Sequence, residues 1–132
     1  MNMIARIESS AAALMAAWSH AKPAHLGQNP TPGMWMTGGA RALVERSDPG
    51  VLATDFAACA SYEGAPEAAQ ALTAAVTVVI GLGDKMTPPK AGRALAAELD
   101  DVTVIELADV GHSMMTEAPR EVRSAILDAA TA

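Results

Sequence analysis

The sequence predicts an α/β protein in which helices come first and a β-α-β-α unit follows. Two runs rich in β-branched residues indicate strands, Ala75–Gly81 and Val102–Leu107. The segment between them has the length and pattern of one helix, and Pro119 begins another. Because a helix separates the strands, we expect them to be parallel and joined by a right-handed crossover. The chain should therefore have two parts, a helical cap-like segment over 1–74 and the β-α-β-α unit over 75–132.

Length, charge and cysteine content narrow the class of protein. The 132 residues suit one domain of ordinary size, and 9 Lys and Arg against 15 Asp and Glu give a net charge of −6. An acidic chain without a basic run argues against nucleic acid and anionic membranes as partners. One cysteine, Cys59, permits no disulfide within the printed sequence. Without a basic, signal-like start or a membrane-length apolar run, we expect a cytoplasmic protein.

The first predicted helix is amphipathic, because its apolar residues recur at alternating spacings of three and four. These residues are Ile4, Ile7, Ala11, Leu14 and Trp18. The helix should end near His20, since prolines and glycines interrupt the segment 21–39. Within that irregular segment lies the apolar group Met34-Trp35-Met36. We favour a role for this group in capping the core over one in lining a substrate entrance.

Three short helices are predicted before the first strand, over Ala40–Arg46, Pro49–Tyr62 and Pro66–Leu72. Ser47 or Asp48 should cap the second of them, because their side chains accept from free N–H groups at a helix start. This second helix should bury one apolar face. The residues of that face are Leu52, Phe56 and Cys59 or Ala60.

Two further helices should cover the strands. Thr87 is expected to cap the helix between the strands, with Pro88 at its first position. The side of that helix expected to face the sheet carries Ala91, Leu95 and Leu99. The inward residues expected in the last helix are Val122, Ala125, Ile126 and Ala129.

Side chains with catalytic potential follow both predicted strands. Asp84 comes after the first and His112 after the second. The carboxyl ends of neighbouring parallel strands meet at one edge, so we expect the two side chains to lie close together. A carboxylate that accepts the imidazole N–H fixes the tautomer and stabilises the imidazolium formed during proton transfer. Alternatively, Asp84 caps a turn and His112 is a loop residue; their matching positions favour catalysis. We expect no metal and no cofactor.

The two segments around these residues, Gly81–Pro89 and Gly111–Pro119, resemble the C-terminal part of an α/β-hydrolase-fold enzyme. In that superfamily the acid follows a late strand, and the histidine follows the next within a G-H-x-x-x-x-E-x-P pattern. The segment Pro49–Tyr62 is similar to the lid region of one bacterial hydrolase group. The resemblance implies a partial α/β-hydrolase fold, with Asp84 as the triad acid and His112 as the base. It also implies structural roles for Asp55 and Cys59.

The chain departs from that family in one important respect. The family order is serine, acid, histidine, with the serine on a G-x-S-x-G turn, and no G-x-S-x-G occurs in this sequence. By the resemblance, Met1 would lie inside the lid region. A minor departure is Ala75-Val76 where the family often has Pro-Thr. The residues that could replace the serine have no strand-turn-helix context or a poor direction, and we expect them to be structural. They are Ser19, Cys59, Ser61 and Ser113.

Three functions remain open from the sequence. The first is a hydrolase for esters or C–C bonds of small acyl compounds, whose serine comes from another chain or gene segment. The second is a non-catalytic oligomer of a truncated hydrolase, a dimer through the edge of Val76–Ile80 or through exchanged lid helices. The third is a module that binds small apolar molecules. Its ligand-binding residues, also the expected substrate contacts of a hydrolase, are Trp18, Met34, Trp35, Met36 and Met114, with Met115 nearby.

Overall fold

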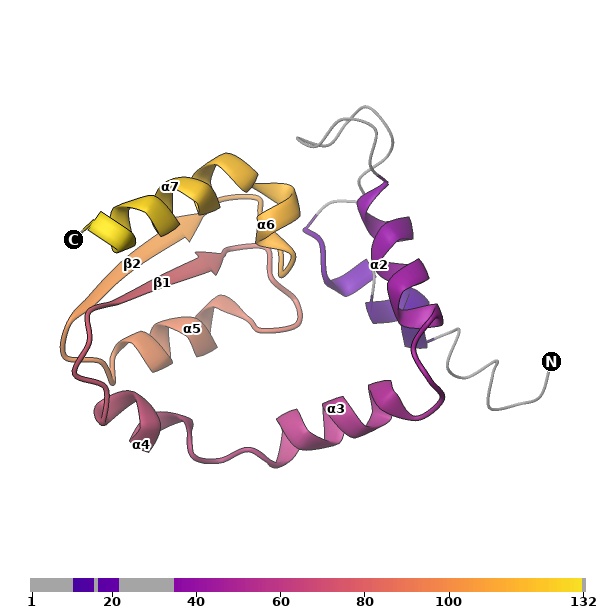
Figure 1. The fold of residues 1–132 in the computed structure, drawn as a ribbon, viewed down its shortest axis with the longest axis horizontal. Helices are drawn as coiled ribbons and strands as arrows, with labels where there is room; N and C mark the ends of the chain where they lie inside the picture. Colours follow the sequence, from indigo (N-terminus) through magenta and orange to yellow (C-terminus); the bar gives the residue numbers. More distant parts are fainter. Residues whose placement is uncertain (1–10, 16, 22–34, 132) are drawn as a thin grey trace.

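The computed structural model describes residues 11–15, 17–21 and 35–131, which form a mixed α/β protein (Figure 1). Residues 11–15, 17 and 18 are helical. The later elements are α2 (Met36–Glu45), α3 (Val51–Ser61), α4 (Ala65–Gln70), β1 (Val76–Gly81), α5 (Pro89–Ala96), β2 (Val102–Leu107), α6 (Met114–Glu117) and α7 (Pro119–Thr131). In this described part, no helix has both the length and the apolar character needed to cross a membrane.

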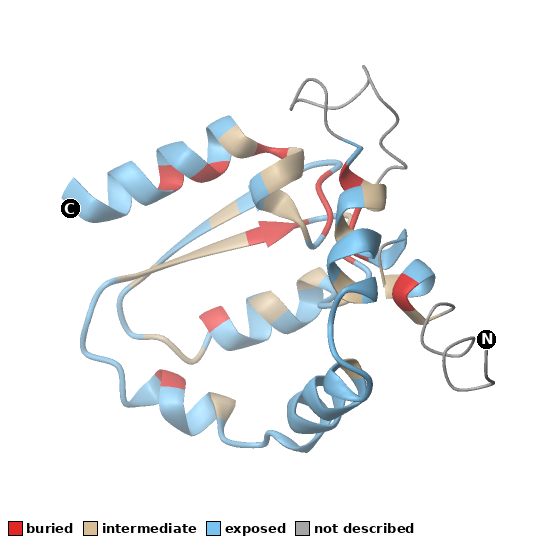
Figure 2. Ribbon diagram, turned by 45° about the vertical axis from the view of Figure 1, so that its right-hand side comes forward, coloured by how far each residue is buried: buried red, intermediate tan, exposed pale blue. Residues whose placement is uncertain are grey.

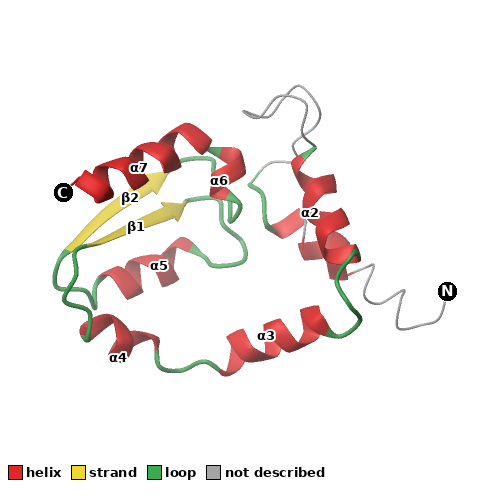
Figure 3. Ribbon diagram, viewed as in Figure 1, coloured by secondary structure: helices red, strands yellow, loops and turns green. Residues whose placement is uncertain are grey.

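The two strands pair in parallel, as the intervening helix predicts. Their register runs from Val76 opposite Val102 to Gly81 opposite Leu107. Helices α5 and α7 lie on opposite faces of this sheet (Figure 3), and both contact β1. The core is therefore built on β1 and the two helices that cover it. Its buried apolar residues are Ile80, Ala96, Val110, Ala118, Val122 and Ala125.

Helix α5 packs on the sheet through smaller residues than the four-residue spacing indicates. Ala96 is buried, and a Cβ added to Gly92 would lie 3.2 Å from the side chain of Ile80. Ala91 is exposed and Leu95 is 40% exposed, so the prediction that these two face the sheet is wrong. The physical reason is close approach, because glycine and alanine let the helix backbone lie directly on the large side chain of Ile80.

Helix α7 begins at Pro119 as predicted, but its buried face is narrower than expected. Val122 and Ala125 are buried, whereas Ile126 is 63% exposed and Ala129 is exposed. A sheet of two strands covers only one stripe of the helix. The apolar residues beside that stripe therefore remain at the surface.

Helix α2 starts at Met36, earlier than the predicted start at Ala40. Prolines and glycines predict an irregular backbone up to residue 39, yet Gly38 lies inside the helix. A Cβ at this position would overlap the indole ring of Trp35, which lies against the glycine. The glycine therefore serves a close side-chain contact here and does not break the helix.

Helix α3 differs from its prediction at its start and in its packing. Its cap is Gly50 with a φ of 91°, a left-handed conformation that suits glycine, and no side-chain cap bond forms. The predicted capping by Ser47 or Asp48 is therefore wrong. No residue of α3 is buried, and Phe56 is 48% exposed (Figure 2). The predicted buried face is also wrong, since α3 lies away from the sheet. Ile4, Ile7 and Met34 lie outside the described residues.

Candidate active site

The site is formed by the turns that leave the two strands. Asp84 lies in the turn after β1, and His112 lies in the turn after β2. The distance from His112 Nδ1 to Asp84 Oδ2 is 2.9 Å. The prediction that both side chains lie at the same edge of the sheet is therefore confirmed. We refer to them below as the Asp84–His112 pair.

Backbone packing brings these turns together. A Cβ added to Gly81, the last residue of β1, would lie 2.5 Å from the carbonyl oxygen of Gly111 and 2.6 Å from that of Val110. Any side chain at this position would separate the two turns. Gly83 then donates its N–H to the carbonyl oxygen of Val110 at 2.8 Å. The first glycine of the Gly-Leu-Gly-Asp segment thus allows the contact, and the second makes a hydrogen bond across it.

The Asp84 carboxylate is held by its own turn. Its side chain is 5% exposed, and Oδ1 accepts the backbone N–H groups of Met86 at 2.8 Å and Thr87 at 2.9 Å. These two bonds leave Oδ2 directed at His112. The backbone of the turn thus fixes the orientation of the carboxylate toward the histidine.

The His112 ring is bonded on one side and open on the other. Nδ1 lies 2.9 Å from Asp84 Oδ2 and 3.1 Å from Thr87 Oγ1. Because the carboxylate can only accept, we assign the ring proton to Nδ1. The ring is 44% exposed, and within the described residues no hydrogen bond forms at Nε2. The lone pair of Nε2 is thus available to take a proton.

Thr87 has a different role from the predicted one. Helix α5 begins at Pro89 with Pro88 at its cap position, and no side-chain cap bond is present. The Thr87 hydroxyl contacts the His112 ring instead, while its backbone N–H holds Asp84. The prediction of a helix cap is wrong, because the turn places this residue between the acid and the base.

Sequence reasoning missed Glu117 as a site residue. Its Oε1 accepts the N–H of Gly111 at 3.0 Å, directly before His112 in the chain. On the other side of the histidine, Ser113 donates its N–H to the carbonyl oxygen of Ser19 at 2.7 Å. The signal was present in the printed sequence, since Glu117 is the acid of the G-H-x-x-x-x-E-x-P pattern.

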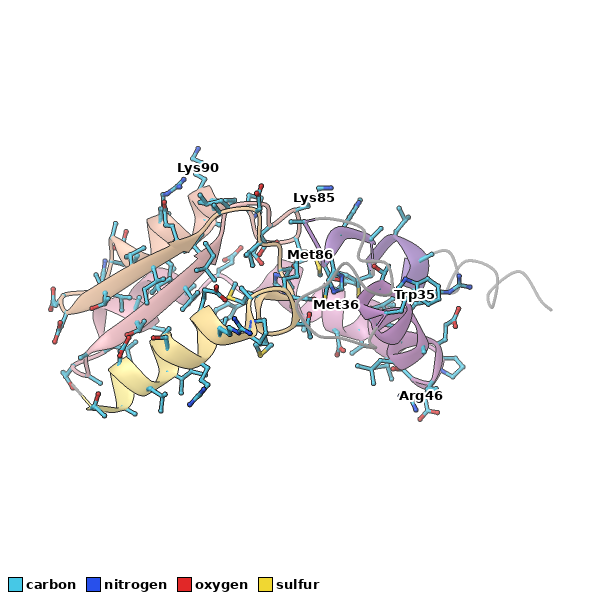
Figure 4. The ribbon with its side chains drawn as sticks, turned by 90° about the horizontal axis from the view of Figure 1, so that it is seen from above. Trp35, Met36, Arg46, Lys85, Met86 and Lys90 are labelled. Atoms are coloured by element: carbon cyan, nitrogen blue, oxygen red, sulfur yellow. The ribbon has the colours of Figure 1, made fainter. Side chains whose placement is uncertain are left out.

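The expected ligand-binding residues are not gathered around a described cavity. Trp18 and Trp35 are 51% and 56% exposed, and Met36 is buried where the helical part meets the rest of the chain (Figure 4). Met114 is half-buried in α6. A cavity of about 640 Å³ is lined by residues 106–110 and 117–121, and one of about 370 Å³ by Ala21, Leu82, Gly83, Lys85, Ala108 and Asp109. The substrate role of the tryptophans and methionines therefore stays a prediction.

The hydroxyl and thiol residues that could replace the serine lie in different parts of the chain. Ser19 Oγ lies 2.9 Å from Nδ1 of the neighbouring His20, and both residues are buried. Ser61 donates to the carbonyl oxygen of Ala58 at the end of α3, and Cys59 is exposed on the same helix. Within the described residues, the hydroxyl that contacts the His112 ring belongs to Thr87. It lies next to Nδ1, the nitrogen that also bonds to Asp84.

Charges outside the pair form one notable contact between α5 and β2. Arg93 Nε lies 2.6 Å from Glu106 Oε1, and this bond lowers the pKa of Glu106 and raises that of Arg93. No group of three or more His, Cys, Asp or Glu suited to a metal ion occurs in the described part of the chain.

No family model matches the sequence, and no curated protein matches it. The geometry of the Asp84–His112 pair is therefore the observation on which a functional proposal can stand.

Proposed function

We propose that this chain carries the acid and the base of a Ser-His-Asp hydrolase of the α/β-hydrolase type. The observation that supports this most is the 2.9 Å bond between His112 Nδ1 and a buried Asp84 carboxylate, at the carboxyl edge of two parallel strands. The resemblance of Gly81–Pro89 and Gly111–Pro119 to that superfamily indicates the substrate class. Esters or C–C bonds of small acyl compounds are the proposed substrates.

The proposed chemistry uses Nε2 of His112 as the base. As a hydroxyl oxygen bonds to the acyl carbon, its proton passes to Nε2, and Asp84 stabilises the resulting imidazolium. The same proton then passes from Nε2 to the leaving group as the scissile bond breaks. A water molecule then attacks the acyl intermediate through the same proton transfers, and the carboxylic acid product is released. The base returns to its starting form after each half of the reaction.

The attacking hydroxyl is the part that this sequence does not identify. It contains no G-x-S-x-G turn, so we propose that the serine belongs to another chain or to a further part of the same polypeptide. Turnover by this chain alone should be weak. Loss of a single oxyanion-hole donor already lowers kcat by about 10²–10³.

Hydrolysis of p-nitrophenyl acetate tests the proposal. General acid–base catalysis contributes about 10²–10⁴-fold, so His112→Ala should fall to the rate of buffer. Asp84→Asn should lose turnover as well, because the amide no longer fixes the Nδ1–H tautomer. Asp101→Asn is the matched control, an exposed aspartate before β2 that should keep the wild-type rate. Equal rates in wild type and both variants of the pair would exclude catalysis by it.

A non-catalytic assembly is the second candidate, and two observations favour it. Helix α3 has no buried residue, and Phe56 on it is 48% exposed. Val76 donates its N–H to Asp101, directly before β2, and Leu82 donates to Leu107 at its end. The alternate residues Thr77 and Val79 therefore direct their N–H groups away from β2. A second copy of the chain could pair along this edge.

Light scattering at low micromolar concentration separates the two candidates. An assembly without catalytic function should show twice the mass of the chain, unchanged in His112→Ala, and no turnover above buffer. A monomeric mass would exclude the assembly. Turnover that depends on His112 would exclude an assembly without catalytic function.

A further inference from the structure

Both oxygens of the Glu117 carboxylate are used, and they join two distant parts of the chain. Oε1 accepts the N–H of Gly111 at 3.0 Å, and Oε2 accepts the N–H of Ala21 at 2.9 Å. Gly111 immediately precedes His112, whereas Ala21 follows the N-terminal helical segment. One half-buried side chain thus connects the histidine turn to residues that lie 96 positions earlier than itself.

The segment 19–21 lies directly against both turns of the site. A Cβ at Gly111 would lie 2.7 Å from the carbonyl carbon of His20, and one at Gly83 would lie 2.7 Å from Cβ of Ala21. The backbone of this segment therefore fills the space beside the turn of Asp84 as well as that of His112. Neither glycine can be enlarged without moving the segment.

The backbone on each side of His112 is held by this arrangement. The N–H before it is bonded to Glu117, and the N–H after it, that of Ser113, is bonded to the carbonyl oxygen of Ser19 at 2.7 Å. The direction of the imidazole depends on the backbone between these two bonds. Glu117 contributes to both, directly through Gly111 and indirectly by fixing Ala21, two residues after Ser19.

We infer that Glu117 is a positioning residue for His112, which it aligns with Asp84 by tying the histidine turn to the segment 19–21. The catalytic significance of this role rests on the proposed function. Glu117 does not touch the ring; its carboxylate acts through two backbone N–H groups. Bonds between a carboxylate and backbone N–H are charge-assisted and directional, so a neutral side chain of the same shape is an inadequate replacement.

Glu117→Gln is the decisive variant. Glutamine keeps the size and one acceptor oxygen, but its amide NH₂ would face one of the two N–H donors. The readout is the NMR signal of the His112 Nδ1–H and its rate of exchange with water. That exchange should accelerate about tenfold or more, the factor that corresponds to one lost hydrogen bond to a charged group. The Gly111 amide should exchange faster as well.

The matched control is Glu121→Gln, which removes the same charge from an exposed position in the first turn of α7. It should leave the exchange at His112 unchanged. A wild-type exchange rate at His112 in Glu117→Gln, with a faster rate at Gly111 alone, would overturn the inference, because Glu117 would then hold the turn and not the ring. An equal effect of both variants would also overturn it, since charge alone would be responsible.

Amide signals of β1 report whether the variant folds. If Glu117→Gln loses them, the same measurement is made on Glu117→Asp, which keeps both oxygens on a side chain shorter by one methylene. Its weaker bridge should still accelerate exchange at His112, and a wild-type rate there overturns the inference.

Failure of this inference and failure of the proposed function are distinguishable. The NMR readout needs no turnover, so it decides the role of Glu117 even if His112→Ala and Asp84→Asn hydrolyse ester at the wild-type rate. Where turnover is present, Glu117→Gln should lower kcat and leave KM within about twofold, because the ring is misaligned while substrate contacts are kept. A changed KM with an unchanged kcat would argue against a positioning role.

Discussion

The two halves of the chain bury their apolar residues to different extents. In residues 75–131, Ile80 and Val122 are buried between the sheet and its covering helices. In the helical half, α3 buries no residue and exposes about half of Phe56. Figure 2 shows buried residues along the sheet and its covering helices, on α4 and in the N-terminal helical segment, while α3 has none. The Asp84–His112 pair thus lies in the half that holds most of the buried apolar residues of the described chain.

The comparison shows what the site requires from each half. The strands, α5 and α7 place Asp84 and His112 at one edge. The helical half reaches this edge through a short segment, residues 19–21, which Glu117 holds. Substitutions in the core of the second half should therefore have large effects on stability, and surface substitutions should have small ones.

The largest effect is expected at Ile80. Ile80→Ala removes a side chain that is 5% exposed and should lower the free energy of unfolding by about 2–5 kcal/mol. Ile126→Ala is the control, because this residue is 63% exposed on α7, and its effect should stay within about 0.5 kcal/mol. Urea unfolding followed by circular dichroism measures both. Equal losses would show that α7 buries Ile126 in solution.

A pair of glycine substitutions should differ in sign between the halves. Gly81→Ala would place a methyl group 2.5 Å from the Gly111 carbonyl oxygen, and we expect a loss of about 1–3 kcal/mol. Gly39→Ala in α2 meets nothing within 4 Å and should gain about 0.5–1 kcal/mol, since alanine favours the helix. The midpoints of urea unfolding report both changes. A destabilising Gly39→Ala would contradict the described packing of α2.

The smallest effect is expected from Glu106→Gln, which removes the ion pair with Arg93. The hydrogen bond from Arg93 lowers the pKa of Glu106 below its ordinary value of 4.5. Because the folded-state pKa is lower than the unfolded one, the pair stabilises the fold above about pH 4.5, and this contribution disappears as the pH falls through the lowered pKa. Both side chains are exposed, so the contribution is small.

Urea unfolding of wild type and Glu106→Gln checks this pH dependence. Wild type should be slightly more stable at about pH 7, and the two proteins should be equal at about pH 3. A difference that grows on acidification would contradict the assignment.

The strands and the pair could be predicted because strong local patterns determine them. The β-branched run of Val76–Gly81 favours a strand, and Asp84 follows in the turn that leaves it. The predictions that proved wrong concern features that depend on tertiary packing. Gly92 and Ala96 of α5, not its larger residues, face the sheet because the helix lies close to Ile80. The spacing of apolar residues along α5 does not predict how closely the helix approaches Ile80.

Helix α3 and Thr87 show two further limits of sequence reasoning. An apolar stripe predicts a buried face only where another element is present to cover it, and none of the described elements covers α3. Thr87 has the chemistry of a helix cap, but its hydroxyl contacts His112 because the turn folds back on the second strand end. The residues next to Thr87 or next to His112 in the sequence give little indication that the two turns are in contact.

The tautomer of His112 tests the central claim most directly. Nitrogen NMR of the labelled imidazole at a pH where the ring is neutral distinguishes a proton on Nδ1 from one on Nε2. The bond to Asp84 predicts a protonated Nδ1 and a free lone pair on Nε2 in wild type, and loss of this preference in Asp84→Asn. A proton on Nε2 in wild type, unchanged in Asp84→Asn, would contradict an acid–base pair at this edge of the sheet.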